Sequence, residues 1–224
     1  MSALQPHAIH SDDPHADQPV LFAGPAPEKA AATLILMHGR GGTAESILDI
    51  YQRLIGVENI AAIAPAAARN TWYPNSFLAP LEANQPYLDS ALNRVKTIVA
   101  DLLSRGVAPE RIALLGFSQG ACLTTEFVAR NPARYGAIMG LTGGLIGPPG
   151  TPRKYPGSLA GTPVFLGTSD PDPHVPFERV KETEVVLSRM GAQVELRQYA
   201  GMPHTINEDE VEACRSLLQN LTEK

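Results

Sequence analysis

The sequence predicts an α/β protein with a mostly parallel central sheet between layers of helices, and two features carry this prediction. Short apolar runs alternate with amphipathic stretches along the 224 residues, as expected when each strand returns through a helix. One of the runs breaks into Gly116-Phe-Ser-Gln-Gly120, and an amphipathic stretch follows at once. The Gly-x-Ser-x-Gly pattern indicates a nucleophilic serine when it stands, as here, in a sharp turn between a strand and a helix.

The strands are expected where apolar residues run without interruption, because a strand covered on both faces shows no polar alternation. The first is an exception, a short edge strand before the turn at residues 24–27. The last ends at Tyr199. The predicted strands are residues 20–23, 33–37, 60–64, 111–117, 135–141, 163–166 and 193–199.

The helices are expected where apolar residues recur at steps of three and four. The clearest example begins at Leu88 and ends before Gly106. In the last helix, Asn207 is followed three residues later by Glu210, a pair typical of a helix N-terminus. The predicted helices are residues 44–54, 88–103, the stretch from the Gly-x-Ser-x-Gly turn to about 131, 177–190 and 207–221.

Two stretches without a clear period, residues 66–85 and 142–162, are expected to be loops. The second holds six Gly and four Pro. Residues 1–18 are polar and rich in Pro and His, and we expect this segment to be loosely ordered at its start. The sequence shows neither an internal repeat nor a linker, so we expect residues 19–224 to form a single domain.

The charge balance argues against nucleic acid and membranes as partners. The chain has 18 Lys and Arg against 23 Asp and Glu, a net charge of -5, so no basic face is expected. No apolar run is long enough to span a bilayer, and the first 30 residues lack the apolar core of a secretory signal. We therefore expect a cytoplasmic protein without membrane insertion. The oligomeric state stays open, a homodimer included.

The cysteines and histidines do not indicate a metal site. Cys122 and Cys214 have neither a disulfide framework nor metal-binding spacing, and both fall at apolar positions of predicted helices, where small core residues are expected. His7, His10 and His15 are expected to belong to a solvated tail, with a metal site as the alternative. Neither a metal nor an organic cofactor is expected.

The turn at residues 116–120 predicts a nucleophilic serine at Ser118. Small residues on both sides let the strand and the helix pass close together. The strained turn makes the Ser118 hydroxyl project above the edge of the sheet, at the positive end of the helix. A plain glycine-rich turn is the alternative.

A serine hydroxyl needs a base, and His204 is the candidate because it follows the strand ending at Tyr199 by a short turn. The orienting acid is expected in the loop after the preceding strand, where Asp170 and Asp172 compete. Spacing alone does not choose between these two carboxyl groups. His174, in the same loop, is interpreted either as a specificity group or as an ordinary loop histidine.

When the serine attacks an ester, the carbonyl oxygen of the ester becomes negatively charged, and this oxyanion needs two backbone N–H donors. One is the N–H that follows the nucleophile, at Gln119, and the other is expected from the glycine-rich loop 38–42. That loop lacks the Gly-Lys-Ser/Thr of a nucleotide-binding loop, which argues against a phosphate site. The guanidinium of Arg40 is expected to meet either an anionic substrate or a structural carboxylate.

Together these residues form five motifs in a characteristic order: Leu-Met-His-Gly-Arg-Gly at 36–41, Trp-Tyr-Pro at 72–74, Gly-Phe-Ser-Gln-Gly at 116–120, Asp-Pro-His-Val-Pro at 172–176 and Gly-Met-Pro-His at 201–204. From about residue 20 to about residue 218, the chain resembles the phospholipase/carboxylesterase branch of the α/β-hydrolases, which includes the acyl-protein thioesterases. The resemblance implies the α/β-hydrolase fold, with helices on both faces of the sheet and no large lid domain.

The resemblance also implies roles for particular residues. It assigns the acid to Asp172 in preference to Asp170, and the oxyanion hole to the backbone N–H groups of Arg40 and Gln119. Three positions depart from the family pattern. Ala121 and Ser169 each stand where the family often has Gly, and Arg40 stands where the thioesterases have Leu. The last difference favours small soluble esters over lipidated proteins as substrates.

The expected function is therefore that of a serine carboxylesterase acting on small to medium esters through an acyl-enzyme, with Ser118, Asp172 and His204 as its catalytic residues. Trp72, Tyr73 and Phe77 are expected either to line the acyl pocket or to pack within their loop. A lysophospholipase or acyl-protein thioesterase is the nearer alternative. A catalytically silent binding protein with the same fold is the more distant one.

Overall fold

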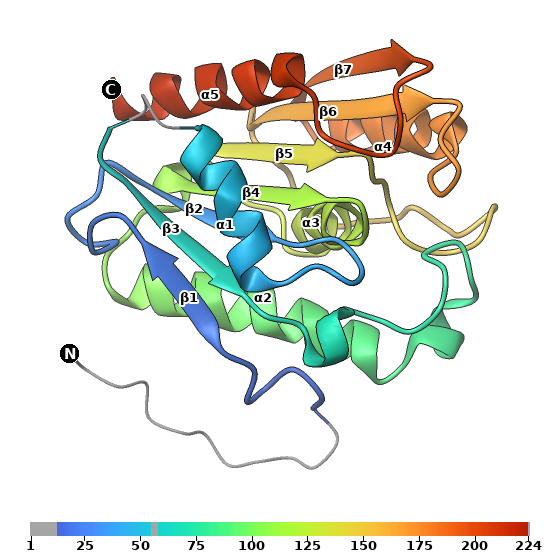
Figure 1. Ribbon diagram of the computed structural model, residues 1–224, viewed down its shortest axis with the longest axis horizontal. Coiled ribbons are helices and arrows are strands. Elements are labelled where there is room, and N and C mark those ends of the chain that lie inside the picture. The colour runs from blue at the N-terminus through green and yellow to red at the C-terminus, as the bar shows by residue number, and fades with distance from the viewer. Residues whose placement is uncertain (1–12, 55–57, 224) are drawn as a thin grey trace.

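The structure, a computed structural model, describes residues 13–54 and 58–223 and contains one seven-stranded sheet (Figure 1). The strands follow one another across the sheet in the order β1-β3-β2-β4-β5-β6-β7. Only β1 runs antiparallel to its neighbour, and all other pairs are parallel. The strands are β1 (Val20–Ala23), β2 (Ala32–Met37), β3 (Ile60–Pro65), β4 (Ile112–Phe117), β5 (Ala137–Leu141), β6 (Pro163–Asp170) and β7 (Gln193–Ala200).

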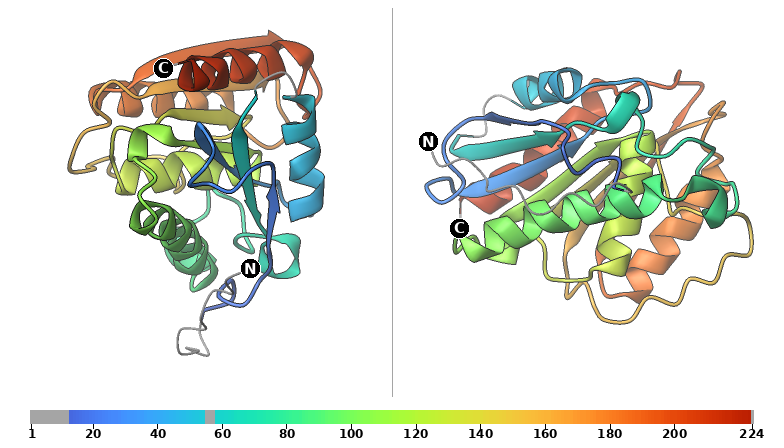
Figure 2. Two further views of the ribbon diagram at one scale, coloured as in Figure 1. Left: turned by 90° about the vertical axis from the view of Figure 1, so that its left-hand side faces the viewer. Right: turned by 90° about the horizontal axis from the view of Figure 1, so that it is seen from below.

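Helices cover both faces of the sheet, which confirms the predicted fold class. Helices α1 and α5 lie on one face and α2, α3 and α4 on the other (Figures 1 and 2). Among the described residues, no helix is long and apolar enough to cross a bilayer. The helices are α1 (Ala44–Arg53), α2 (Tyr87–Ser104), α3 (Gln119–Arg130), α4 (Phe177–Arg189) and α5 (Glu208–Thr222).

The uninterrupted apolar runs follow from this layered arrangement. In β2 every residue is buried, and successive side chains enter two different cores. Ile35 and Met37 pack with α2 and α3, whereas Leu34 and Leu36 pack with α1 and α5. A strand between two helical layers therefore has no solvent-facing side that a polar residue could occupy.

Several predicted boundaries differ from the observed ones. The predicted strand 135–141 starts only at Ala137, because Tyr135 instead donates its backbone N–H to Thr162 and its hydroxyl to the carbonyl of Asn131. Strand β6 continues to Asp170, four residues beyond the expected end, since it pairs with β7 over its whole length. The expected loop at 66–85 contains two short 3-10 helices, Ala68–Asn70 and Leu81–Asn84.

The prediction that His15 belongs to a solvated tail is wrong, because this side chain is fully buried. Its Nε2 donates to the carbonyl of Trp72 at 3.0 Å, and its Nδ1 accepts from the N–H of Ala68 at 3.0 Å. Burial lowers the pKa of His15, in keeping with a neutral ring that fills both roles. His7, His10 and the start of the segment lie outside the described residues, so their loose ordering stays a prediction.

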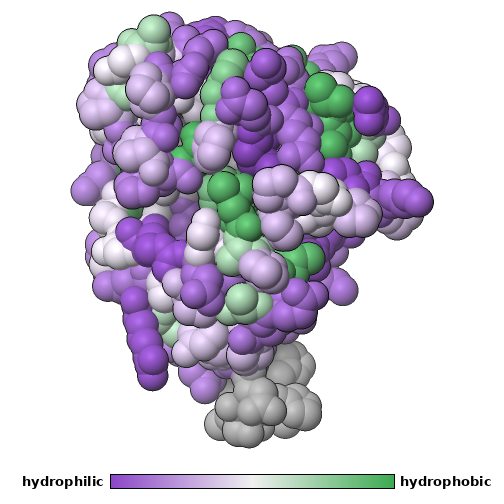
Figure 3. Space-filling model, turned by 90° about the vertical axis from the view of Figure 1, so that its right-hand side faces the viewer, coloured by the Kyte–Doolittle hydropathy of each residue, from purple (hydrophilic) through white to green (hydrophobic). Residues whose placement is uncertain are grey.

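The parallel strands place the predicted site residues at one edge of the sheet. The carboxyl ends of β2, β4, β6 and β7 lead directly into the loops that hold residues 38–42, Ser118, Asp172 and His204. Figure 3 views the molecule from this edge, where hydrophobic residues show as separate patches among hydrophilic ones. Parallel α/β sheets bind ligands at the carboxyl ends of their strands.

Candidate active site

Ser118 occupies the sharp turn between β4 and α3, in a strained backbone conformation (φ 53°, ψ -118°). The turn brings the backbone so close to Gly116 and Gly120 that neither position has room for a side chain, and only glycine can be accommodated there. A Cβ added at Gly116 would lie 2.2 Å from the carbonyl oxygen of Gly120, and one at Gly120 would lie 2.1 Å from that of Met37. The helix can therefore start directly against the ends of β2 and β4 and present Ser118 at the edge of the sheet.

Three side chains from separate loops form one hydrogen-bonded line. The Nε2 of His204 lies 2.9 Å from the Oγ of Ser118, and its Nδ1 lies 2.8 Å from the Oδ2 of Asp172. The Asp172 side chain is fully buried, whereas that of His204 is 19% exposed. The structure thus brings together the three side chains that the sequence analysis expects to act as nucleophile, base and acid.

Asp172 is held in place by more than its contact with His204. Its Oδ1 accepts the N–H groups of His174 and Val175, each at 2.8 Å, and its Oδ2 also accepts the hydroxyl of Ser169 at 2.8 Å. Burial alone would raise the pKa of Asp172, but these bonds together with that from His204 lower it below its usual value. The carboxyl is therefore ionised at neutral pH.

The second candidate for the acid, Asp170, does not contact His204. Its Oδ2 accepts a hydrogen bond from Nε2 of Gln198 on β7, at 2.7 Å. The hydroxyl of Ser169, at a position where the family often has Gly, was not predicted to act in the site, yet it donates to Asp172. Nothing in the spacing of residues signals such a contact.

Two backbone N–H groups beside Ser118 fit the expected oxyanion hole. The Gln119 N–H is the first of α3, and the first N–H groups of a helix have no partner within it. In the loop after β2, the N–H of Gly41 bonds to Asn70 and that of Gly42 to Gly39. Among the described residues, the N–H of Arg40 has no hydrogen-bond partner, as its expected role requires.

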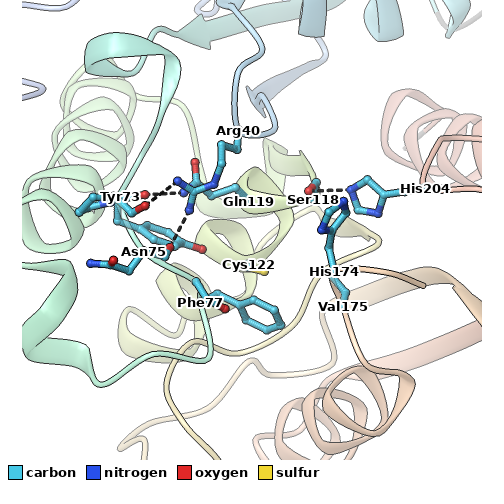
Figure 4. A pocket seen from close by; sticks show the side chains of 12 residues that line it. Arg40, Tyr73, Asn75, Phe77, Ser118, Gln119, Cys122, His174, Val175 and His204 are labelled. Carbon is cyan, nitrogen blue, oxygen red and sulfur yellow. Dashed lines mark hydrogen bonds between the residues drawn. The ribbon is translucent and has the colours of Figure 1, made fainter. Parts of the chain in front are cut away.

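Among the described residues, the guanidinium of Arg40 forms no ion pair with a carboxylate, so the expected structural carboxylate is not found there. It donates to the Oγ1 of Thr71 at 3.2 Å, the carbonyl of Pro74 at 2.8 Å and the carbonyl of Asn75 at 2.6 Å. These acceptors belong to the loop before α2, which forms one wall of the site (Figure 4).

A pocket of about 370 Å³ opens beside Ser118. Its walls come from the loop 73–77, from Cys122 in the first turns of α3, and from His174 and Val175 in the loop after β6 (Figure 4). Phe77 lines this pocket, as predicted. The ring of His174 contacts that of His204 edge-on, with the ring centres 4.9 Å apart.

The predicted substrate-binding role of Trp72 is wrong, because its side chain is fully buried behind the pocket wall. The indole N–H donates to the carbonyl of His38 at 2.8 Å, and the indole stacks on the His38 ring with the ring centres 4.9 Å apart. A buried indole needs a partner for its N–H, and the end of β2 supplies that carbonyl. The neighbouring Tyr73 borders the pocket instead.

Both cysteines are buried, in agreement with their predicted place in the core. Burial raises the pKa of the Cys122 thiol to about 12 and raises that of Cys214 as well, so both stay protonated. Within residues 13–54 and 58–223, no three His, Cys, Asp or Glu side chains form a group that could hold a metal ion.

Glu210 lies buried at the start of α5, six residues after His204. Its Oε2 accepts the N–H of Asn207 at 3.0 Å, and the Oδ1 of Asn207 accepts the N–H of Glu210 at 2.8 Å. Within the described part of the chain, the Oε1 of Glu210 has no hydrogen-bond partner. Burial raises the pKa of this carboxyl to about 7.

Replacing Glu210 with Gln is expected to stabilise the protein at alkaline pH. Because the pKa is higher in the folded state than its usual 4.5, folding favours the protonated form. The associated stability is complete below about pH 4.5 and is lost as the pH rises through about 7. A Gln side chain can still accept the N–H of Asn207 at the start of the helix, and it carries no charge. Urea unfolding at about pH 8.5 should give a free energy of unfolding about 3 kcal/mol above wild type, and an equal gain at about pH 4 would contradict this explanation.

Comparison with known proteins identifies related sequences and structures. The family model described as Phospholipase/Carboxylesterase matches residues 22–222. The chain belongs to the phospholipase/carboxylesterase family. This membership and the α/β-hydrolase fold predicted from the sequence are thus confirmed, and the protein is a hydrolase that acts on carboxylic esters.

Relatives in this family include bacterial and fungal proteins. The crystal structure of a phospholipase/carboxylesterase from Dyadobacter fermentans is 42% identical, covers 90% of this chain and 96% of that chain, and has a TM-score of 0.86. Acyl-protein thioesterase 1 of Gibberella zeae is 24% identical over 90% of this chain and 94% of its own length. The match to acyl-protein thioesterase 1 of Saccharomyces cerevisiae is 31% identical but spans 58% of each chain.

Proposed function

We propose that the protein is a serine carboxylesterase that hydrolyses small to medium esters through an acyl-enzyme on Ser118. The observation that supports it best is the line of two hydrogen bonds from Ser118 through His204 to Asp172. A serine attacks an ester only when a base takes its proton, and a base so placed also needs an acid to orient it.

In the proposed reaction, the Oγ of Ser118 attacks the ester carbonyl carbon while its proton passes to Nε2 of His204. Asp172 holds the other ring nitrogen and stabilises the imidazolium that forms. The carbonyl oxygen becomes an oxyanion, which accepts the N–H groups of Arg40 and Gln119. As the bond to the alcohol oxygen breaks, His204 gives its proton to that oxygen, and the alcohol leaves.

Water completes the cycle. It attacks the acyl group on Ser118 while His204 takes one of its protons, and the same two N–H groups hold the second oxyanion. Ser118 then leaves as the alcohol, regains its proton from His204, and the carboxylic acid is released. These steps use only this chain and water.

The size of the pocket supports a small to medium acyl group. Its volume of about 370 Å³ lies near the lower end of the range found for ligand pockets. Its inner wall is closed by buried side chains, among them Tyr73, Cys122 and Val175.

A fluorophosphonate probe tests the nucleophile directly. The reagent forms a bond between phosphorus and an activated serine oxygen, with loss of fluoride, so it is expected to modify Ser118 in the folded protein. Digestion and mass spectrometry locate the adduct. Labelling at another serine would contradict the assignment, and the absence of labelling would favour a silent binding protein with this fold.

The alternative, a lysophospholipase or acyl-protein thioesterase, is supported by the names of the fungal relatives. A series of p-nitrophenyl esters from acetate to palmitate, with a palmitoyl thioester beside it, separates the two. We expect kcat/KM to be greatest for the short and medium acyl chains. An optimum at palmitate, or a preference for the thioester, would favour the alternative. The cytoplasmic location, the absence of nucleic-acid partners and the homodimer stay predictions.

A further inference from the structure

The side chains of Arg40 and Gln119, whose backbone N–H groups form the proposed oxyanion hole, both bind one segment of the chain. This segment, residues 71–75, lies in the loop before α2. Arg40 binds it through three hydrogen bonds, one to the Oγ1 of Thr71 and two to the carbonyls of Pro74 and Asn75. Its guanidinium also lies over the ring of Tyr73, 6.0 Å from the ring centre.

Gln119 binds the same segment, and Figure 4 shows its side chain together with those of Arg40 and Tyr73. Its Nε2 donates to the carbonyl of Tyr73 at 2.8 Å. Its Oε1 accepts the N–H of Trp72 at 2.9 Å and the hydroxyl of Thr71 at 3.2 Å. The Gln119 side chain is buried, so these bonds compete little with water.

The segment is itself fixed to the rest of the molecule. The indole of Trp72 donates to the carbonyl of His38, at the end of β2. The N–H of Asn75 donates to the Oδ1 of Asn84 at 2.8 Å, and Asn84 is buried in the turn before α2. Segment 71–75 therefore offers a firm support to any side chain that binds it.

The loop that carries the Arg40 amide needs such a support. Gly39 precedes Arg40, and Gly41 and Gly42 follow it, so the backbone there has few steric restraints. Gly41 has a φ of +76° and open space where a Cβ would lie. A donor that must meet an oxyanion at about 3 Å loses most of its effect when its loop moves by an ångström.

We propose that the side chains of Arg40 and Gln119 are positioning groups for the oxyanion hole: by binding segment 71–75, they fix the direction of their own backbone N–H groups. This inference rests on the proposed function. It assigns the two side chains a role apart from substrate binding, because each acts through the amide of its own residue.

The test compares Arg40→Met, Arg40→Lys and Gln119→Ala with wild type, using p-nitrophenyl acetate. We expect Arg40→Met and Gln119→Ala each to lower kcat about 10- to 100-fold with little change in KM, since a poorly placed donor affects the transition state. Arg40→Lys keeps the charge but not the planar set of donors, and should fall between Arg40→Met and wild type. Active-site concentrations are set by fluorophosphonate labelling.

A second measurement separates positioning from general loss of structure. A trifluoromethyl ketone adds the Ser118 oxygen to its carbonyl carbon and forms a tetrahedral oxyanion. Its affinity should fall by the same factor as kcat/KM in Arg40→Met and Gln119→Ala. Because both side chains bind one segment, the double variant should lose little more than either single variant.

Arg111→Met is the matched control. Arg111 also donates to two backbone carbonyls, those of Ala30 and Ala31, but it lies at the amino end of β4, away from Ser118. Its loss should lower the melting temperature without changing kcat per labelled site.

Unchanged kcat and ketone affinity in both Arg40→Met and Gln119→Ala would overturn the proposal. A loss in Arg40→Met that Arg40→Lys restores in full, with none in Gln119→Ala, would assign the effect to charge. If Ser118→Ala keeps its activity, the proposed function itself fails.

Discussion

Replacing Ser118 with Ala is expected to lower kcat for p-nitrophenyl acetate about a millionfold, to a rate set by the rest of the site. The change removes the atom that forms the acyl-enzyme and leaves His204 without a proton to accept. The two N–H groups and the pocket remain, so a residual rate above that of water alone is expected. Initial rates measured at high protein concentration, after removal of any wild-type contaminant by labelling, provide the value.

The fold should survive this substitution, because Ser118 is only half buried and its hydroxyl bonds to a single partner. His204→Ala should lose a similar amount, and the double variant should lose no more than either single variant, since the two groups act as a unit. Ser104→Ala, at the exposed end of α2, is the control and should match wild type. Retained turnover in Ser118→Ala would show that another group performs the chemistry.

Asp172→Asn is expected to lower kcat about ten-thousandfold. The amide has nearly the same shape but no charge, so it cannot stabilise the imidazolium of His204. Its NH2 group also has to replace either Oδ1, to which two backbone N–H groups now donate, or Oδ2, to which Ser169 and His204 now donate. Initial rates for p-nitrophenyl acetate, expressed per site labelled by the fluorophosphonate probe, provide the value.

Asp170→Asn is the matched control, because Asp170 lies two positions before Asp172, at the last residue of β6. Its partner is Gln198, and an amide can replace the carboxylate in that contact. We expect its kcat to stay within about threefold of wild type. If the two variants lost equal activity, the loop as a whole rather than the Asp172 carboxylate would be responsible. A larger loss in Asp170→Asn would reverse the assignment of the acid.

Much of the fold was predictable because its elements leave strong local signals. The buried strands at 33–37 and 60–64 contain only residues that fill a core on both faces. The turn at Ser118 could be located because strand, glycines and helix occur together in the sequence. His204 followed from chain order and from the position of its loop at the carboxyl end of a strand.

The other features of the site could not be predicted, because they depend on the direction in which a side chain or a loop points, and the local sequence does not encode that direction. A single residue, Pro171, separates Asp170 from Asp172, and only the path of the backbone decides which carboxyl meets His204. The aromatic residues at 72–77 all suit a pocket by composition, yet Trp72 turns inward because its N–H finds a carbonyl at the end of β2. The partners of Arg40 are mainly backbone carbonyls, which have no signature in the spacing of side chains.

The close approach of Gly120 to the end of β2 limits where the protein can vary. A Cβ at that position would lie 2.1 Å from the backbone oxygen of Met37, so no side chain can be accommodated there without moving the strand. New substrate preferences must therefore arise from the surrounding loops, above all at Asn75, Phe77 and Val175. A library randomised at these three positions would change selectivity while leaving Ser118, His204 and Asp172 in place.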